Sequence, residues 1–138
     1  MKPSNKSGSP LHEAGLRQTP QRRGILRALE ASNRPLSVDE IWRAMGEGRS
    51  GVPTVYRNLE RFVREGWVEP LLGADQVVRY ARCHSKEHHH HLQCEHCGRT
   101  VEVGDCGLSS VGKLLEKRTG YRITRHQLLL FGICPECQ

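Results

Sequence analysis

Histidine and cysteine side chains gather in one short stretch of the sequence, HHHHLQCEHCG, which covers residues 88–98. Imidazole nitrogens and thiolate sulfurs are ligands that zinc prefers in proteins. In an extended strand, neighbouring side chains point to opposite faces, so His88 and His90 are expected to share one face. His89 and His91 then share the other face. Each pair offers two ligands and zinc takes four, so the stretch predicts two metal sites that need further ligands from elsewhere.

Two Cys-x-x-Cys pairs make the most specific pattern in the chain, Cys94 with Cys97 and Cys134 with Cys137. Each pair presents two thiolates to one ion, and two pairs brought together complete a closed tetrahedral zinc site. A redox dithiol, a pair of disulfides and an iron site are the alternatives. In a reducing compartment, metal binding is favoured over disulfides. We therefore expect a structural zinc, without which a module this small would not fold.

Composition and charge narrow the class of protein further. The chain has 138 residues, is 36% hydrophobic and contains only two Phe, which favours two small modules over one large core. No stretch is apolar enough to span a membrane, and the start lacks the apolar core of a signal peptide, so we expect a cytoplasmic protein. Residues 1–34 carry seven Lys or Arg against two Glu, within a net charge of +6. This asymmetry favours a polyanionic partner such as nucleic acid.

Three helices and a hairpin are expected in the first part of the chain. Thr19 has the position of an N-cap ahead of Pro20, and Ser37 with Glu40 has the spacing of a capping box. Pro53 marks the start of a third helix, which we expect to end near residue 66. Two strands follow, over residues 67–72 and 76–83, joined by a Gly-Ala-Asp turn. This order predicts a winged helix-turn-helix domain over residues 1–83.

The third helix has the features of a DNA-recognition helix. An apolar stripe recurs along it at helical spacing, and hydroxyl-bearing, aromatic and cationic side chains lie on the opposite side. Such groups contact base edges, thymine methyls and phosphates, although a solvated amphipathic face is the alternative. The surrounding winged layout favours nucleic acid. The stripe consists of Val55, Leu59, Phe62 and Val63, and the opposite side consists of Thr54, Tyr56, Arg57, Arg61 and Arg64.

Residues 84–138 are expected to form a second, small α/β domain, which makes the whole chain α+β. A linker over residues 84–87 precedes two strands, over residues 89–94 and 99–103. A helix is expected over residues 108–120 and a last strand over residues 121–134. The domain closes on the second Cys-x-x-Cys pair.

The motifs GLRQTPQRRGIL, TVYRNLERFVREG, HHHHLQCEHCG and YRITRHQLLLFGICPEC together resemble the Fur family of metal-sensing repressors. The resemblance covers nearly all of the chain from about residue 11. It implies a homodimer in which the winged helix-turn-helix domain binds palindromic DNA and the C-terminal domain dimerises. It also implies a structural zinc, a regulatory metal at the interdomain hinge, and a minor-groove contact by Arg17. Members of such a family are not enzymes and take no small-molecule substrate.

The resemblance also bears on which metal is sensed. Ferric-uptake and peroxide-sensing members carry a histidine ligand between the first two main helices, where this chain has Pro35. Zinc-uptake members instead use an acidic residue on the first wing strand and a cysteine after the second, which correspond to Glu69 and Cys83. These two residues are expected to meet His89 and His91. One thiolate, two imidazoles and one carboxylate suit tetrahedral zinc better than iron(II) or manganese(II).

The other histidine face resembles a third site of the family. His88 and His90 correspond to two of its ligands and His126 to another, but the family's glutamate is replaced by Ser109. Water, Asp105 or Cys106 would have to complete the site, or it is vestigial. The resemblance assigns no role to Cys106.

These observations predict a zinc-responsive repressor of zinc-uptake genes that binds DNA when zinc is plentiful. It would hold two zinc ions per subunit, and a third if the last site is filled. A family member that senses iron or peroxide is one alternative. A zinc-binding redox enzyme and a zinc module that only mediates protein contacts are alternatives of other classes.

Overall fold

The protein is described by a computed structural model, which covers residues 15–85, 87–104 and 106–138. The chain divides into two compact units, Met1–His84 and Ser85–Gln138. This division lies close to the domain boundary expected after residue 83. Among the described residues, no helix has the length and apolarity needed to cross a bilayer.

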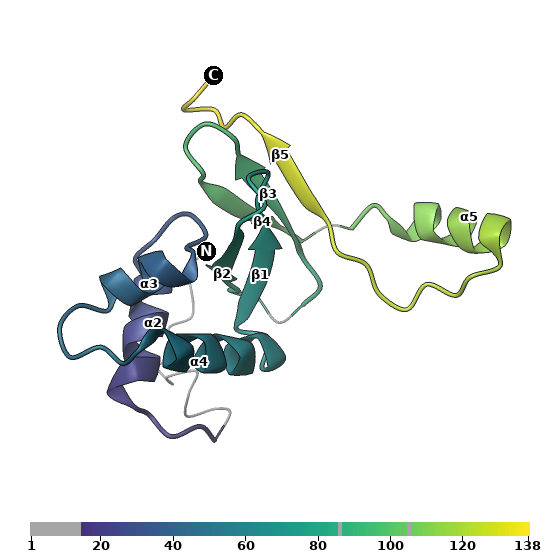
Figure 1. Ribbon diagram of the computed structural model, residues 1–138. Helices are drawn as coiled ribbons and strands as arrows, with labels where there is room; N and C mark the ends of the chain where they lie inside the picture. The colour runs from purple at the N-terminus through teal and green to yellow at the C-terminus, as the bar shows by residue number, and fades with distance from the viewer. Residues whose placement is uncertain (1–14, 86, 105) are drawn as a thin grey trace, which may run out of the picture. The chain divides into compact units, whose positions relative to one another are not determined.

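The N-terminal unit consists of three helices and a β-hairpin (Figure 1). Helix α4 leads through a short turn into β1, which pairs with β2 in an antiparallel ladder. Leu36, between α2 and α3, adds an isolated antiparallel bridge to Tyr80 on β2. This arrangement is the winged helix-turn-helix that the sequence predicted. The elements are α2 (Pro20–Glu30), α3 (Val38–Ala44), α4 (Val52–Arg64), β1 (Val68–Leu72) and β2 (Val78–Arg82).

Local capping signals set the starts of the first two of these helices. The Thr19 side chain accepts a hydrogen bond of 3.3 Å from the Arg22 backbone N–H. Ser37 and Glu40 form the expected capping box, in which each side chain accepts a hydrogen bond from the other residue's backbone N–H. A hydrogen bond of 2.7 Å from the Arg34 guanidinium lowers the pKa of Glu40 to about 2. The carboxylate therefore stays ionised for capping across the physiological pH range.

The core of the N-terminal unit holds α4 in a fixed rotation. Val55, Leu59 and Phe62, from the predicted apolar stripe, are fully buried, whereas Val63 at its edge is only half-buried. The Phe62 ring lies 5.4 Å from the ring of Trp67, which begins the hairpin. Burial of this stripe turns the opposite side of α4 towards solvent.

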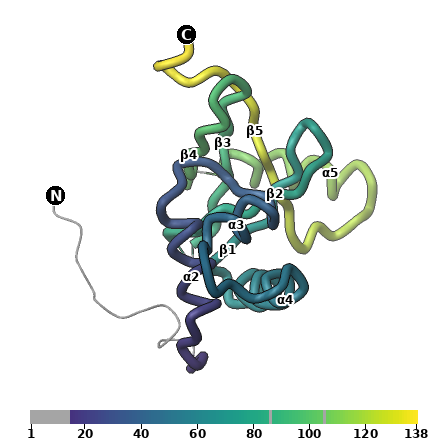
Figure 2. The backbone as a smooth tube through the Cα atoms, turned by 60° about the vertical axis from the view of Figure 1, so that its left-hand side comes forward, coloured from purple at the N-terminus to yellow at the C-terminus, as the bar shows by residue number. Residues whose placement is uncertain are grey.

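The C-terminal unit is built on a three-stranded sheet whose central strand carries the histidine run. Strand β3 (His90–Cys94) pairs antiparallel with β4 (Thr100–Val103) and parallel with β5 (Leu129–Gly132). Parallel neighbours need a crossover connection, and helix α5 (Ser109–Thr119) lies in it (Figure 2).

The expected last strand is wrong for residues 121–128, which form neither helix nor strand. The ladder between β5 and β3 pairs Leu129 with His91, near the first residue of β3. The ladder therefore begins at Leu129, and the residues before it take no part in the sheet.

Apolar side chains of the C-terminal unit remain exposed in a single copy of the chain. Helix α5 has no buried residue, and its Leu114 is 51% exposed. Several large apolar side chains exposed on one small unit are typical of a surface that contacts another protein. The exposed side chains on α5 and β5 are Val111, Leu114, Leu115, Leu130 and Phe131.

The capping box generates a test of the N-terminal unit. Ser37→Ala removes the side chain that accepts the Glu40 backbone N–H, and is expected to lower the free energy of unfolding by about 1 kcal/mol. Urea titration followed by tryptophan fluorescence measures this unit alone, because Trp42 and Trp67 are the only tryptophans. Ser110→Ala, on exposed α5, is the matched control and should leave the transition unchanged. An unchanged midpoint for Ser37→Ala would show that the box does not stabilise α3.

Candidate functional site

The four cysteines of the two Cys-x-x-Cys pairs come together at one edge of the C-terminal sheet. Cys94 ends β3 and pairs in register with Gly132, which ends the parallel strand β5. The loops that follow these two strand ends therefore lie side by side, and each carries one cysteine pair. All four sulfur atoms lie within 4.8 Å of one another. We refer to Cys94, Cys97, Cys134 and Cys137 as the four-cysteine cluster.

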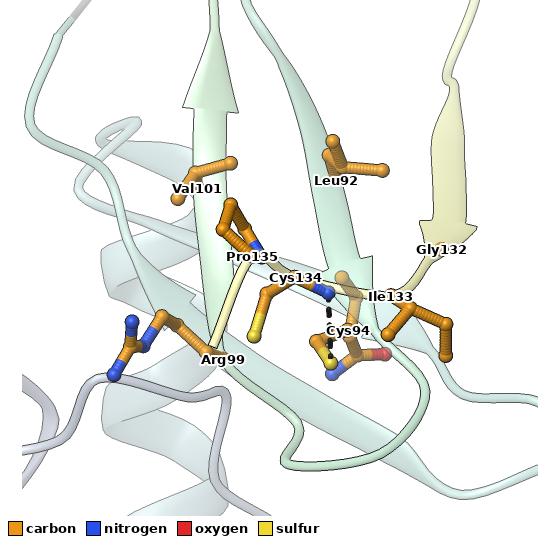
Figure 3. A pocket seen from close by; sticks show the side chains of 9 residues that line it. Leu92, Cys94, Arg99, Val101, Gly132, Ile133, Cys134 and Pro135 are labelled. Atoms are coloured by element: carbon orange, nitrogen blue, oxygen red, sulfur yellow. Dashed lines mark hydrogen bonds between the residues drawn. The ribbon is translucent and has the colours of Figure 1, made fainter. Parts of the chain in front are cut away.

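The cluster has the chemistry of a thiolate metal site rather than of a disulfide. None of the chain's six cysteines, all within the described part, forms a disulfide. The Cys97 and Cys134 sulfurs are 3.8 Å apart, against about 2.05 Å for a disulfide bond. Backbone N–H groups, first that of Cys97 and then that of Cys134, lower the pKa of Cys94 to about 6. Figure 3 shows the Cys134 N–H pointing at the Cys94 sulfur, at 3.4 Å.

The thiols of the cluster do not all ionise with equal ease, because a charge on one sulfur disfavours a charge on its neighbours. Hydrogen bonding to Cys134 is the main cause that raises the pKa of Cys137 to about 12. Four thiols this close cannot all ionise unless a cation offsets their mutual repulsion. A zinc ion supplies that charge and accepts four sulfur ligands, so the donor set fits zinc.

An apolar pocket lies beside the cluster, with Cys94 and Cys134 in its lining (Figure 3). Leu92 and Val101 line one part of it, and Ile133 and Pro135 line another. Arg99, which also lines the pocket, forms an ion pair of 2.6 Å with Glu136 that ties the first cysteine loop to the second.

His89 and His91 share one side of β3 and are joined there by Glu102. Glu102 is the cross-strand partner of His91 on β4, so their side chains leave the same face of the sheet. The ligand atoms of the three residues lie within 4.8 Å of one another. We call this group the histidine triad. The sequence reasoning missed Glu102, although its alternation with Val101 and Val103 in a predicted strand was a usable signal.

Glu69 and Cys83 form a second group of donors, within the N-terminal unit. Glu69 pairs with Ala81 across the hairpin, and the Cys83 N–H donates to the Trp67 carbonyl at 2.8 Å. The two side chains are therefore diagonal neighbours on one face. A Glu69 carboxylate oxygen and the Cys83 sulfur lie within 4.8 Å of each other. We call these two residues the wing pair.

The opposite side of the histidine run holds a further group. The Nε2 atoms of His88 and His90 are 3.1 Å apart, and the Nε2 atom of His126 lies 3.3 Å from that of His90. Cys106 joins them, whereas Asp105, the other residue considered for this site, lies outside the described residues. We call His88, His90, Cys106 and His126 the His3Cys cluster.

The exposed side of α4 carries the side chains expected to contact DNA. Tyr56 is 48% exposed, and the Arg57 guanidinium donates to the Thr54 hydroxyl at 3.2 Å. Arg61 instead forms an ion pair of 2.8 Å with Glu65, one turn along the helix.

Arg22 links this helix to the segment that contains Arg17. Its Nε donates to the Asn58 side chain on α4 at 3.0 Å, and its Nη1 donates to the Arg17 carbonyl at 2.8 Å. The sequence reasoning counted Arg22 only as charge and missed this positioning contact, because its partner Asn58 is distant in the chain.

Comparison with known proteins identifies the family. The model of the ferric uptake regulator family matches residues 13–131, which include Cys94 and Cys97 and end before Cys134 and Cys137. The chain belongs to the ferric uptake regulator family. Members of this family are DNA-binding transcriptional regulators and not enzymes, as the sequence predicted.

Individual family members resemble the chain in different respects. In sequence, it is 34% identical over 135 residues to the peroxide-responsive repressor PerR of Staphylococcus aureus, covering 96% of this chain and 90% of that protein. In structure, the holo form of XcZur matches with a TM-score of 0.74 at 27% identity, over 93% of this chain and 91% of that one. A zinc uptake regulator in complex with zinc and DNA matches with a TM-score of 0.75 at 22% identity, over 92% and 87%.

Proposed function

We propose that this family member is a cytoplasmic, zinc-responsive repressor that binds palindromic operators of zinc-uptake genes as a homodimer. The observation that carries this proposal is the donor set of the wing pair, a thiolate from Cys83 beside a carboxylate from Glu69. A thiolate ligand favours zinc over iron(II) or manganese(II), which prefer oxygen and nitrogen. The likeness to holo XcZur supports the same assignment.

The mechanism follows from the placement of donors on two units. The wing pair belongs to the N-terminal unit, and His89 and His91 belong to the C-terminal unit. We propose that one zinc ion accepts all four ligands and so ties the units together. In a homodimer, this restraint fixes the spacing between two α4 helices, and therefore their fit to two operator half-sites. Coupling of this kind is typically worth about 1–3 kcal/mol per site.

The wing pair has a direct connection to α4 that supports this mechanism. Trp67 accepts the backbone hydrogen bond of Cys83 and packs against Phe62 in the core stripe of α4. A metal ligand at residue 83 is therefore anchored to the same aromatic pair that fixes the rotation of the recognition helix. Thr54, Tyr56 and Arg57 on α4 contact the operator in this proposal, and Arg17 reaches the minor groove.

A second ion, held by the four-cysteine cluster, has a structural role in this proposal. Its four sulfur ligands leave no open position for a substrate or a sensing ligand. The ion joins the loop after β3 to the loop after β5, and so stabilises a sheet that has little buried apolar surface of its own. The exposed apolar side chains of α5 and β5 are then covered by the second copy of the chain.

A sensor of iron or peroxide is the second candidate, and one observation favours it. Glu102 places a carboxylate beside His89 and His91, and a further oxygen ligand suits iron(II) or manganese(II). The identity to the staphylococcal peroxide-responsive repressor points the same way. The two candidates differ in whether Cys83 is needed for the metal response.

Replacement of Cys83 separates these candidates. Cys83→Ser should keep the dimer mass and secondary structure but require much more free zinc to bind operator DNA, because one soft ligand is lost. Gel shifts at buffered free zinc, iron(II) and manganese(II) measure this response. Glu69→Gln should act in the same direction, and its matched control Glu47→Gln, in an exposed loop, should have no effect. Operator binding by Cys83→Ser at the wild-type zinc level would overturn the zinc assignment.

Replacement of a cysteine in the four-cysteine cluster should act on folding instead of sensing. Cys97→Ser is expected to abolish the tightly held zinc and unfold the C-terminal unit, because metal binding and folding are coupled in so small a module. Zinc content, dimer mass and far-UV circular dichroism report this loss, while the tryptophan fluorescence of the N-terminal unit persists. His96→Ala, between the two cysteines and exposed, is the control. A folded, dimeric Cys97→Ser protein would contradict the structural role.

The recognition helix is tested by Arg57→Ala. Loss of a bidentate base contact should weaken operator binding by about 1–3 kcal/mol and relax base preference at one position. Fluorescence anisotropy with operator and scrambled duplexes measures both effects. Arg118→Ala removes the same charge from exposed α5 and should leave the ratio of the two affinities unchanged. Equal losses for the two variants would mean that Arg57 contributes only nonspecific charge.

A further inference from the structure

The His3Cys cluster brings four metal-binding atoms to one point within the C-terminal unit. His90 is buried on β3, whereas His88 and His126 are exposed and come from segments before β3 and before β5. The Cys106 sulfur lies 3.1 Å from the Nε2 atom of His90 and 3.1 Å from that of His126. The three imidazoles therefore direct their Nε2 atoms at a shared centre. The Cys106 thiol provides a fourth donor atom there.

Hydrogen bonding alone does not account for this convergence. The His90 Nε2 atom lies within 3.3 Å of three acceptor or donor atoms, those of His88, Cys106 and His126. A neutral imidazole nitrogen offers either one N–H or one lone pair, so it can satisfy only one of these contacts well. A cation at the centre would instead accept a lone pair from every donor at once.

The spacing of the four atoms matches the coordination shell of a tetrahedral ion. Zinc–nitrogen bonds of about 2.0–2.1 Å and a zinc–sulfur bond of about 2.3 Å place donor atoms roughly 3.3–3.6 Å apart. The separations of His90 from His88, Cys106 and His126, and of Cys106 from His126, run from 3.1 Å to 3.3 Å, at or just below this range. All four donor atoms lie within 4.8 Å of one another. The His88 ring is at 89° to His90 and at 75° to His126, whereas the His90 and His126 rings are tilted by 36°.

We propose that His88, His90, His126 and the thiolate of Cys106 form a four-ligand site for a borderline-soft divalent cation, with zinc as the first choice. The new element is Cys106, which supplies the donor that Ser109 does not. One sulfur and three imidazole nitrogens favour zinc over magnesium, calcium or manganese. The site lies wholly within the C-terminal unit, so it does not depend on which metal the regulatory site senses.

The positions of the ligands in the chain indicate which part of the fold the ion would hold in place. Cys106 precedes α5 and His126 follows it, while His90 belongs to the central strand. A shared ion therefore closes both ends of the α5 connection onto β3. Because α5 has no buried residue in a single copy, this clamp would fix how its exposed Val111, Leu114 and Leu115 are presented to the second copy.

Cobalt(II) provides a direct test, because a thiolate ligand produces a charge-transfer band in the near ultraviolet. Full-length Cys83→Ser protein, with one zinc per subunit in the four-cysteine cluster, is titrated with cobalt(II). We expect a thiolate band that saturates at one added equivalent if Cys106 binds it. The same titration of Cys83→Ser/Cys106→Ser should lose the band and bind this cobalt at least tenfold more weakly, since losing only a hydrogen-bond partner of a ligand costs roughly 10–100-fold. Cys83→Ser/Ser109→Ala is the matched control and should keep the band.

Each alternative outcome of this titration overturns the proposal. Cobalt bound without a thiolate band would mean a site of histidines and water. A band that persists in Cys83→Ser/Cys106→Ser would mean exchange into the four-cysteine cluster. All of these proteins carry Cys83→Ser, so Cys83 cannot produce the band in any of them. The test of Cys106 therefore stays valid even if the proposed regulatory site is wrong.

Alkylation of the wild-type protein tests the same site without a substitution. Zinc at a third equivalent per subunit should slow the reaction of Cys106 with iodoacetamide at least tenfold, as followed by mass spectrometry of the Cys106 peptide. Magnesium at the same concentration should not slow it. An alkylation rate that does not respond to zinc would overturn the assignment of Cys106 as a ligand, whatever the folding of the variants.

Discussion

The two-residue period of the histidine run is the constraint on which the metal chemistry of the C-terminal unit depends. Because alternate residues leave opposite faces, His90 and His91 enter different clusters although they are adjacent. The same strand ends at Cys94, in register with the end of β5, and so brings the two cysteine loops together. A shift of register by one residue would exchange the two histidine faces and separate the cysteine pairs.

The N-terminal unit depends on a comparable constraint, the packing of Trp67 against Phe62. Trp67 connects the end of α4 to the start of the wing, and its carbonyl accepts the hydrogen bond of the Cys83 N–H. Movement of the wing is therefore resisted by the core that orients α4. A regulator of this design can turn a change at a metal ligand into a change at the DNA-binding surface without a separate transmitting element.

The metal-binding clusters of the C-terminal unit differ in the softness of their donor atoms, so they would select different metals. The four-cysteine cluster offers only sulfur, the His3Cys cluster offers one sulfur and three nitrogens, and the histidine triad offers nitrogens and a carboxylate. Ligand softness decreases along this series, and zinc is favoured most strongly where sulfur predominates. Zinc specificity in the proposed regulatory site therefore depends on Cys83, because the histidine triad alone also suits iron(II).

Local signals in the sequence determined the elements that depend on neighbouring residues. Thr19, Ser37 and Glu40 marked helix starts because capping is a contact within one turn, and the buried stripe of α4 followed from its helical period. The resemblance supplied the family. Tertiary structure alone decided the contacts between distant segments: the carboxylate of Glu102 beside His91, Cys106 beside His126, and the end of strand pairing before Leu129. These depend on strand register and on where a partner strand stops, which are properties of two segments together, so neither segment alone determines the partner.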